Sequence, residues 1–187
     1  MMKNKRIGLD LDGVLYPFPT VCYDILNKKH NFGFDEIEFW SRTKRSNRFY
    51  GKHRVEVDKI VADPNTYFAA HLSDDTKKVL NKLADKNELF YITARPPHLK
   101  PVTELWFNYN DIPCKKNLYI GYHSKREIVQ ELKLDILVDD RDYIIEEVKD
   151  ITNAFRFWSS YLTEDDVLDS HSKYISDLSE LLTINIW

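Results

Sequence analysis

Apolar and polar residues alternate in two distinct ways along this chain. Several short, almost continuous apolar runs have the length and composition of buried strands. Between them lie segments whose apolar residues recur every three or four positions, as on one face of a helix. The expected strands are residues 5–11, 88–94, 117–122, 135–140 and 153–158, and the expected helices are residues 19–30, 73–86, 99–110, 124–132, 142–149 and 173–182.

This alternation predicts an α/β fold, namely a Rossmann-like parallel sheet with helices on both faces. Residues 32–72 depart from the alternation, because they are aromatic, basic and irregular. We expect short helices there, forming a small helical cap inserted after the first strand. The expected division is a core domain of residues 1–15 and 73–187 and a cap of residues 16–72.

The composition is that of an ordinary globular protein: 43% of the 187 residues are hydrophobic and 30% are charged. A net charge of −3 provides no general attraction for nucleic acid. The basic stretch from Arg42 to Arg48 could contact a phosphate or simply face water. Cys22 and Cys114 have no metal-binding or disulfide spacing, which fits a reducing compartment. With no apolar leader and no membrane-length segment, we expect a cytoplasmic protein without membrane contact.

Polar residues collect where the predicted strands end, which is where open parallel sheets bind their ligands. Each of these residues also has an ordinary structural explanation. An Asp-x-Asp sequence is often a solvated turn, and an aspartate after a strand often caps the next helix. A functional role is favoured because all of these residues fall at the ends of predicted strands. They are Asp10 and Asp12; Thr93, Ala94 and Arg95; His123, Ser124 and Lys125; and Asp139 and Asp140.

The carboxylates among these residues predict a metal site. Asp10 and Asp12 are two positions apart and can share one small volume. Asp139 and Asp140 end another strand, and carboxylates gathered this closely repel unless a hard cation lies among them. Oxygen ligands of this kind are those that Mg²⁺ prefers.

The remaining strand-end residues predict phosphoryl chemistry. The Thr93 hydroxyl and the Lys125 ammonium could hold the oxygens of a phosphoryl group. One carboxylate can then attack phosphorus, and a second can transfer a proton to the leaving oxygen.

Four ordered motifs resemble those of the haloacid dehalogenase superfamily of phosphohydrolases: "DLDGV" from Asp10, "YITAR" from Tyr91, Lys125 in "SKREIV", and "LVDD" ending at Asp140. The resemblance implies that Asp10 is the nucleophile, Asp12 the general acid/base, and Thr93, Ala94 and Lys125 the phosphate-binding residues.

The same resemblance implies that Mg²⁺ is bound by Asp10, the main-chain carbonyl of Asp12, and one residue of the final acidic pair. We expect Asp140 to be the direct ligand, because neighbouring strand residues point to opposite faces. Asp139 would then act through water or pair with Lys125.

Within the superfamily the chain most resembles the 5'(3')-deoxyribonucleotidases, whose first motif continues as in "DGVLYPF". This implies hydrolysis of nucleoside 5'-monophosphates under a cap, with Phe18 and Trp40 against the base. Ala94 occupies a position where that group often has serine, so the identity of the substrate is left open. The alternatives are another small phosphomonoester, a nucleic-acid 3' end, or a catalytically silent metal- or nucleotide-binding relative. A homodimer is also left open, and the histidines show no zinc-binding spacing.

Overall fold

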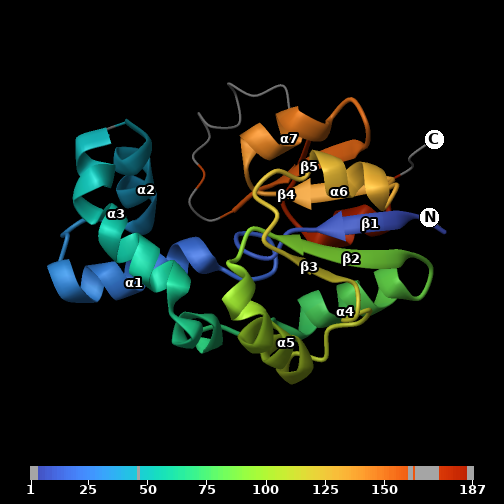
Figure 1. Cartoon of the computed structure of the whole chain (residues 1–187), viewed down its shortest axis with the longest axis horizontal. Coiled ribbons are helices and arrows are strands. Elements are labelled where there is room, and N and C mark those ends of the chain that lie inside the picture. The colour runs from blue at the N-terminus through green and yellow to red at the C-terminus, as the bar shows by residue number, and fades with distance from the viewer. Residues whose placement is uncertain (1–3, 46, 160–161, 163–172, 185–187) are drawn as a thin grey trace.

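The computed structural model describes residues 4–45, 47–159, 162 and 173–184. A six-stranded parallel sheet lies at its centre (Figure 1), in the order β3-β2-β1-β4-β5-β6. The predicted α/β architecture is therefore confirmed. The strands are β1 (Arg6–Leu9), β2 (Glu88–Thr93), β3 (Leu118–Ile120), β4 (Ile136–Asp139), β5 (Asn153–Phe157) and β6 (Lys173–Ile175).

Helices follow the strands as the sequence pattern predicts, and each expected strand and helix before residue 158 is found within a few positions of its expected ends. The α-helices are α1 (Phe18–His30), α2 (Glu36–Arg45), α3 (Asn47–Ala62), α4 (Asp74–Ala84), α5 (Lys100–Tyr109), α6 (Arg126–Glu131) and α7 (Asp142–Val148). The short 3₁₀ helices are η1 (Pro64–Phe68), η2 (Pro97–Leu99) and η3 (Leu178–Leu182).

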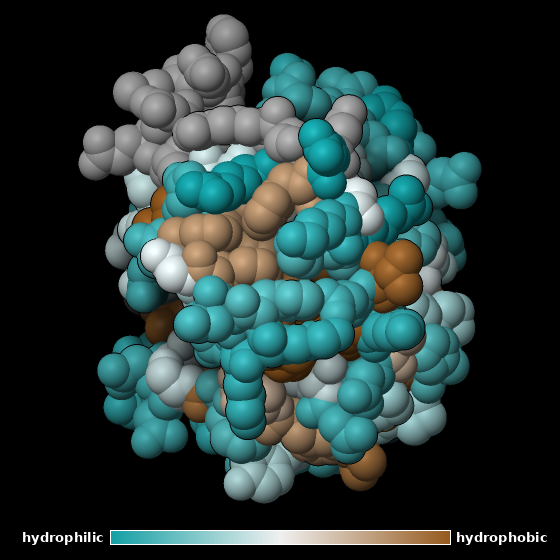
Figure 2. Space-filling view, turned by 90° about the vertical axis from the view of Figure 1, so that its left-hand side faces the viewer, coloured by the Kyte–Doolittle hydropathy of each residue, from teal (hydrophilic) through white to brown (hydrophobic). Residues whose placement is uncertain are grey.

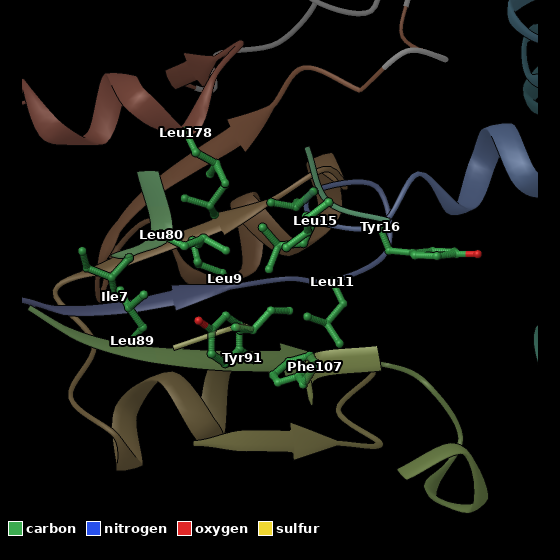
Figure 3. Close-up of a cluster of buried hydrophobic side chains, with 14 of the residues drawn as sticks. Ile7, Leu9, Leu11, Leu15, Tyr16, Leu80, Leu89, Tyr91, Phe107 and Leu178 are labelled. Atoms are coloured by element: carbon green, nitrogen blue, oxygen red, sulfur yellow. The ribbon is translucent and has the colours of Figure 1, made fainter. Parts of the chain in front are cut away.

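The sheet is covered on both faces, because successive residues of each strand point in opposite directions. In β1, Ile7 and Leu9 point into a core that also contains residues of α4, α5 and η3 (Figure 3). On the opposite face, Leu137 of β4 belongs to a second core formed with α6 and α7. The central strands β1, β2 and β4 are thus buried on both sides, which holds their carboxyl ends in fixed positions.

A third apolar cluster lies outside the sheet, within α1, α2 and α3. Leu26, Phe39 and Ile60 form its centre. Figure 1 shows these three helices beyond the carboxyl ends of the strands. Figure 2, which faces this end of the molecule, shows a mostly hydrophilic surface. The helices therefore bury these central residues among themselves, while Ile25, Ile37 and Val55 stay exposed. The sequence predicts short helices here, but α3 spans 16 residues.

The helix predicted over residues 173–182 is wrong. Lys173, Tyr174 and Ile175 form β6, which pairs with β5 and buries Ile175. A new helical turn begins only after Asp177, whose carboxylate accepts a hydrogen bond from the backbone N–H of Ser179. The Glu180 carboxylate accepts one from the backbone N–H of Asp177 in return, which completes a capping box. Pairing with the sheet therefore outweighs the helical pattern of this segment.

Candidate functional site

Three of the predicted aspartates meet at the carboxyl ends of β1 and β4. These strands are neighbours in the sheet, so Asp10 and the pair Asp139 and Asp140 leave it side by side. All three side chains are buried, and each offers a carboxylate oxygen within 4.8 Å of the others. The predicted acidic cluster is therefore present as a buried group of oxygen ligands.

The ammonium group of Lys125 lies between two of these carboxylates. Its Nζ donates to Oδ1 of Asp10 and to Oδ2 of Asp139, both at 2.5 Å, and only 2% of the side chain is exposed. Pairing of Asp139 with Lys125 is one of the two arrangements expected from the sequence. Burial lowers the pKa of Lys125, but Asp10 and Asp139 raise it more, so the group stays charged.

The carboxyl group of Asp10 has an unusual proton affinity. Burial raises its pKa, Lys125 opposes the shift and Asp139 adds to it, which brings the pKa to about 6. The backbone N–H of Asp10 donates to the carbonyl of Val138 at 2.9 Å, so the residue is still tied to β4. Asp10 is thus a rigidly held carboxylate whose charge depends on its neighbours.

The turn after β1 needs glycine at position 13. Gly13 has a φ of +92°, which residues with a Cβ rarely adopt. A Cβ there would also lie 2.1 Å from Oδ2 of Asp140. The absence of a side chain therefore lets the Asp140 carboxylate lie directly against the turn that carries Asp10 and Asp12.

Asp12 makes a two-point ion pair with Arg95, which follows β2. Nε of Arg95 donates to one carboxylate oxygen at 2.9 Å and Nη2 donates to the other at 2.7 Å. The guanidinium group also donates to Thr103 and lies over the ring of Tyr67, 4.1 Å from its centroid. Burial lowers the pKa of Arg95, but Asp12 raises it more. Asp12 is thus fixed in orientation by a buried cation.

A pocket of about 130 Å³ opens beside these groups. It brings together the predicted residues Asp10, Asp12, Thr93, Ala94 and Phe18. Lys125, Asp139 and Asp140 do not line it but lie in the layer beneath, in contact with Asp10 or with its turn. The pocket is also lined by Val61, Tyr67, Arg95, His123 and Arg141.

The predicted Trp40 does not belong to this group. It lies in α2, where its ring packs edge-on against Phe39 at 5.0 Å between centroids. Phe18, in contrast, stacks on Tyr67 at 6.2 Å. Of the two aromatic residues expected against a base, only Phe18 lines the pocket, so the role of Trp40 stays a prediction.

Sequence reasoning assigned no role to two arginines of the pocket. The strand-end rule collects Arg95, two positions after β2, but gives it no role. The same rule could have found Arg141, which lies two positions after β4. The backbone N–H of Arg141 donates to the other oxygen of Asp139 at 2.9 Å. Their guanidinium groups give an otherwise acidic pocket the positive charge that an anionic substrate needs.

Within the part of the chain that the structure describes, no helix has both the length and the apolar character required to span a membrane. No family model matches the chain.

Curated proteins similar to the chain include two named as candidate nucleotidases. One, from Halalkalibacterium halodurans, is 28% identical over 144 residues, which cover 74% of this chain and 71% of that protein. The other, from Bacillus subtilis strain 168, is 27% identical over 140 residues, which cover 72% and 69%.

A solved structure shares the fold. It is a hydrolase of the haloacid dehalogenase-like family from Streptococcus pneumoniae, which superimposes with a TM-score of 0.67 at 14% identity. The match covers 98% of this chain and 99% of that one.

Proposed function

We propose that this chain is a hydrolase of the haloacid dehalogenase superfamily related to nucleotidases, and that it removes the phosphate group from nucleoside 5'-monophosphates with the help of Mg²⁺. Deoxyribonucleotides are the proposed preference, following the resemblance of the first motif. The observation that carries the proposal is the contact of Asp10 with Lys125 at the floor of a pocket lined by carboxylates and arginines.

Asp10 is the proposed nucleophile. Asp10 lines the pocket and its Oδ1 accepts a hydrogen bond from Lys125, so the orientation of its carboxylate is set before substrate arrives. Attack on phosphorus forms an aspartyl-phosphate and releases the nucleoside oxygen. Thr93 and Arg141 line the pocket, where they would offer a donor and positive charge to the phosphoryl oxygens, and Lys125 adds its charge from behind Asp10, which stabilises the transition state.

Asp12 is the proposed general acid/base. It lines the same pocket as Asp10, so it can reach the leaving oxygen and later the water that hydrolyses the intermediate. Its ion pair with Arg95 holds it in place for both steps. Arg95 is therefore a positioning residue in this proposal.

The acidic cluster fits Mg²⁺, since its ligand atoms are buried carboxylate oxygens. Asp10, the main-chain carbonyl of Asp12 and Asp140 would hold the ion, and Asp139 would keep its pairing with Lys125. When bound, Mg²⁺ would neutralise charge on the phosphoryl group and on the carboxylates around it.

We also propose that residues 16–72 form a cap over the core of residues 1–15 and 73–187. The pocket of about 130 Å³ is smaller than typical small-molecule sites, so a whole nucleotide requires opening at the cap. Phe18 and Tyr67 lie at this boundary and could stack a base, an interaction of about 1–3 kcal/mol. A cytoplasmic setting remains part of the proposal, since Cys22 and Cys114 are both free thiols.

The test is phosphate release from a panel of nucleoside monophosphates and other small phosphomonoesters, with and without Mg²⁺. Asp10→Asn is the inactive variant. Asp135→Asn is its matched control, because Asp135 precedes β4 at the opposite end of the sheet, where it pairs with Lys5. Release from deoxynucleotides that needs Mg²⁺ and Asp10 would support the whole proposal.

Two other results would change it. Release only from other phosphomonoesters would keep the mechanism and discard the nucleotide substrate. Full activity of Asp10→Asn would remove Asp10 as nucleophile, and the absence of release from every substrate would favour a silent binding protein.

A further inference from the structure

Two histidines and a glutamate meet between α1 and α3, away from the pocket. His30 is the last residue of α1, whereas His53 and Glu56 are three positions apart on one face of α3. Each of the three side chains offers one ligand atom, and these atoms lie within 4.8 Å of one another. Two imidazoles and a carboxylate are thus brought together from two helices.

Glu56 points one oxygen at both histidines. Its Oε2 is 2.6 Å from Nε2 of His30 and 3.8 Å from Nδ1 of His53. Its other oxygen, Oε1, accepts a hydrogen bond from the ammonium group of Lys29. These hydrogen bonds from Lys29 and His30 lower the pKa of Glu56 to about 2, so the carboxylate is charged. Lys29 therefore orients the carboxylate without occupying the oxygen that faces the imidazoles.

His53 is the observation that points to a ligand. Only 2% of the residue is exposed, and among the described residues neither ring nitrogen has a hydrogen-bond partner. The rings of Phe32, Phe39 and Phe49 surround it, with centroid distances of 5.3, 6.1 and 5.0 Å. A buried polar ring without a partner is costly and uncommon, so a missing partner is the simplest explanation.

We propose that His30, His53 and Glu56 bind a divalent transition metal, with Zn²⁺ as the best fit. Two imidazole nitrogens and one carboxylate oxygen are a known zinc ligand set. The acidic cluster of Asp10, Asp139 and Asp140 offers only oxygen, so the two sites prefer different metals. His30 and Glu56 are 29% and 23% exposed, which leaves an approach for the ion and for a water ligand.

Such an ion would join the end of α1 to the middle of α3. It would therefore stabilise the folded arrangement of α1, α2 and α3, since a ligand that binds only the folded state raises its stability. This inference is independent of the proposed phosphatase activity, because none of its residues lines the pocket.

The test uses the full chain, freed of metals with a chelator and then saturated with Mg²⁺ to fill the acidic cluster. Co²⁺ is added as a spectroscopic probe, and Zn²⁺ binding is measured by calorimetry. We expect one equivalent of Co²⁺ to give a visible absorption band that Zn²⁺ abolishes, and Zn²⁺ to raise the melting temperature. Absence of Zn²⁺ binding to the wild-type chain at micromolar concentrations would overturn the proposal.

Substitutions of the proposed ligands test where the ion binds. His30→Ala and Glu56→Gln remove partly exposed ligands and should weaken Zn²⁺ binding by about tenfold or more. His71→Ala is the control, because His71 lies outside the group and packs against Tyr109. Unchanged binding in both ligand variants would overturn the proposal. If circular dichroism shows that His30→Ala is unfolded, Glu56→Gln alone decides.

Discussion

The guanidinium group of Arg95 binds both carboxylate oxygens of Asp12, at 2.9 and 2.7 Å. The two residues are 83 positions apart in the chain, and the pair joins the turn after β1 to the turn after β2. Since Asp12 lines the pocket beside Asp10, this contact fixes the angle at which Asp12 can meet a ligand. The proposed role of Asp12 therefore depends on an arginine at position 95.

Replacing Arg95 tests this requirement. Arg95→Lys keeps the charge but loses the planar two-point contact, so Asp12 would be misplaced and kcat should fall about tenfold or more with a smaller change in KM. Arg126→Lys is the control, because Arg126 makes the same type of pair with Asp150 on the surface. Steady-state kinetics of both variants are the measurement. Equal kcat values for Arg95→Lys and the wild type would show that Asp12 needs no positioning.

Lys125 should matter most when no metal is bound. In Lys125→Met the charges of Asp10 and Asp139 lose their cation, and the free energy of unfolding should fall by about 3 kcal/mol or more. Urea unfolding in the absence and presence of Mg²⁺ measures this. We expect Mg²⁺ to restore more stability to the variant than it adds to the wild type, because repulsion among the carboxylates is relieved.

Lys5→Met provides the matched comparison for Lys125→Met. Lys5 pairs with Asp135 at the other end of the sheet, where both side chains are about a third exposed. Exposed pairs contribute about 0–1 kcal/mol, so this variant should unfold almost as the wild type does, with no difference in its response to Mg²⁺. A similar loss in the two variants would contradict the importance of burial at Lys125.

Gly13→Ala should damage the acidic cluster. The added methyl group would strain the backbone at a φ of +92° and displace the carboxylate of Asp140. We expect lower stability and weaker Mg²⁺ binding by calorimetry. Gly51→Ala is the contrasting substitution, since Gly51 lies within α3 and a Cβ there has no neighbour within 4 Å. It should stabilise the protein by about 0.5–1 kcal/mol through helix propensity. Mg²⁺ binding that is unaffected by Gly13→Ala would exclude Asp140 as a ligand.

The two thiols should differ in reactivity. Cys22 is fully buried and burial raises its pKa to about 12, so it is neither accessible nor ionised near neutral pH. Cys114 is exposed. A thiol reagent should label one cysteine per native chain and two per chain in denaturant. Cys114→Ser should abolish the native reaction, and rapid labelling that persists in this variant would contradict the packing of α1.

The fold can be predicted from the sequence because each strand before residue 158 is an apolar run and most helices show a regular apolar face. The sequence also predicts where Asp10, Asp12, Lys125 and Asp139 lie, because residues at or after the end of a strand are placed at the edge of a parallel sheet. The pattern fails at residues 173–182, where apolar spacing fits a helix but β5 offers an open edge that takes Tyr174 and its neighbours as β6.

Contacts between side chains that are far apart in the sequence could not be predicted from the sequence pattern. The partner of Asp12 could not be read from spacing, because several arginines follow strands and only the folded chain shows which one reaches it. The same holds for His30, His53 and Glu56, whose spacing is no metal motif until α1 and α3 are placed together. Trp40 was expected near the pocket by resemblance, whereas the packing of α2 places its ring against Phe39.

The position of β1 in the middle of the sheet has a consequence for the newborn chain. Asp10 leaves the ribosome 115 residues before Lys125, a delay of about 6–23 s at ordinary rates of synthesis. Throughout that interval β1 lacks β4 as a neighbour, and Asp10 lacks the ammonium group of Lys125. Assembly of the site is therefore a late event that follows translation of most of the chain. A translation product interrupted before Lys125 would expose an unpaired edge of β1 and would lack Lys125, Asp139 and Asp140.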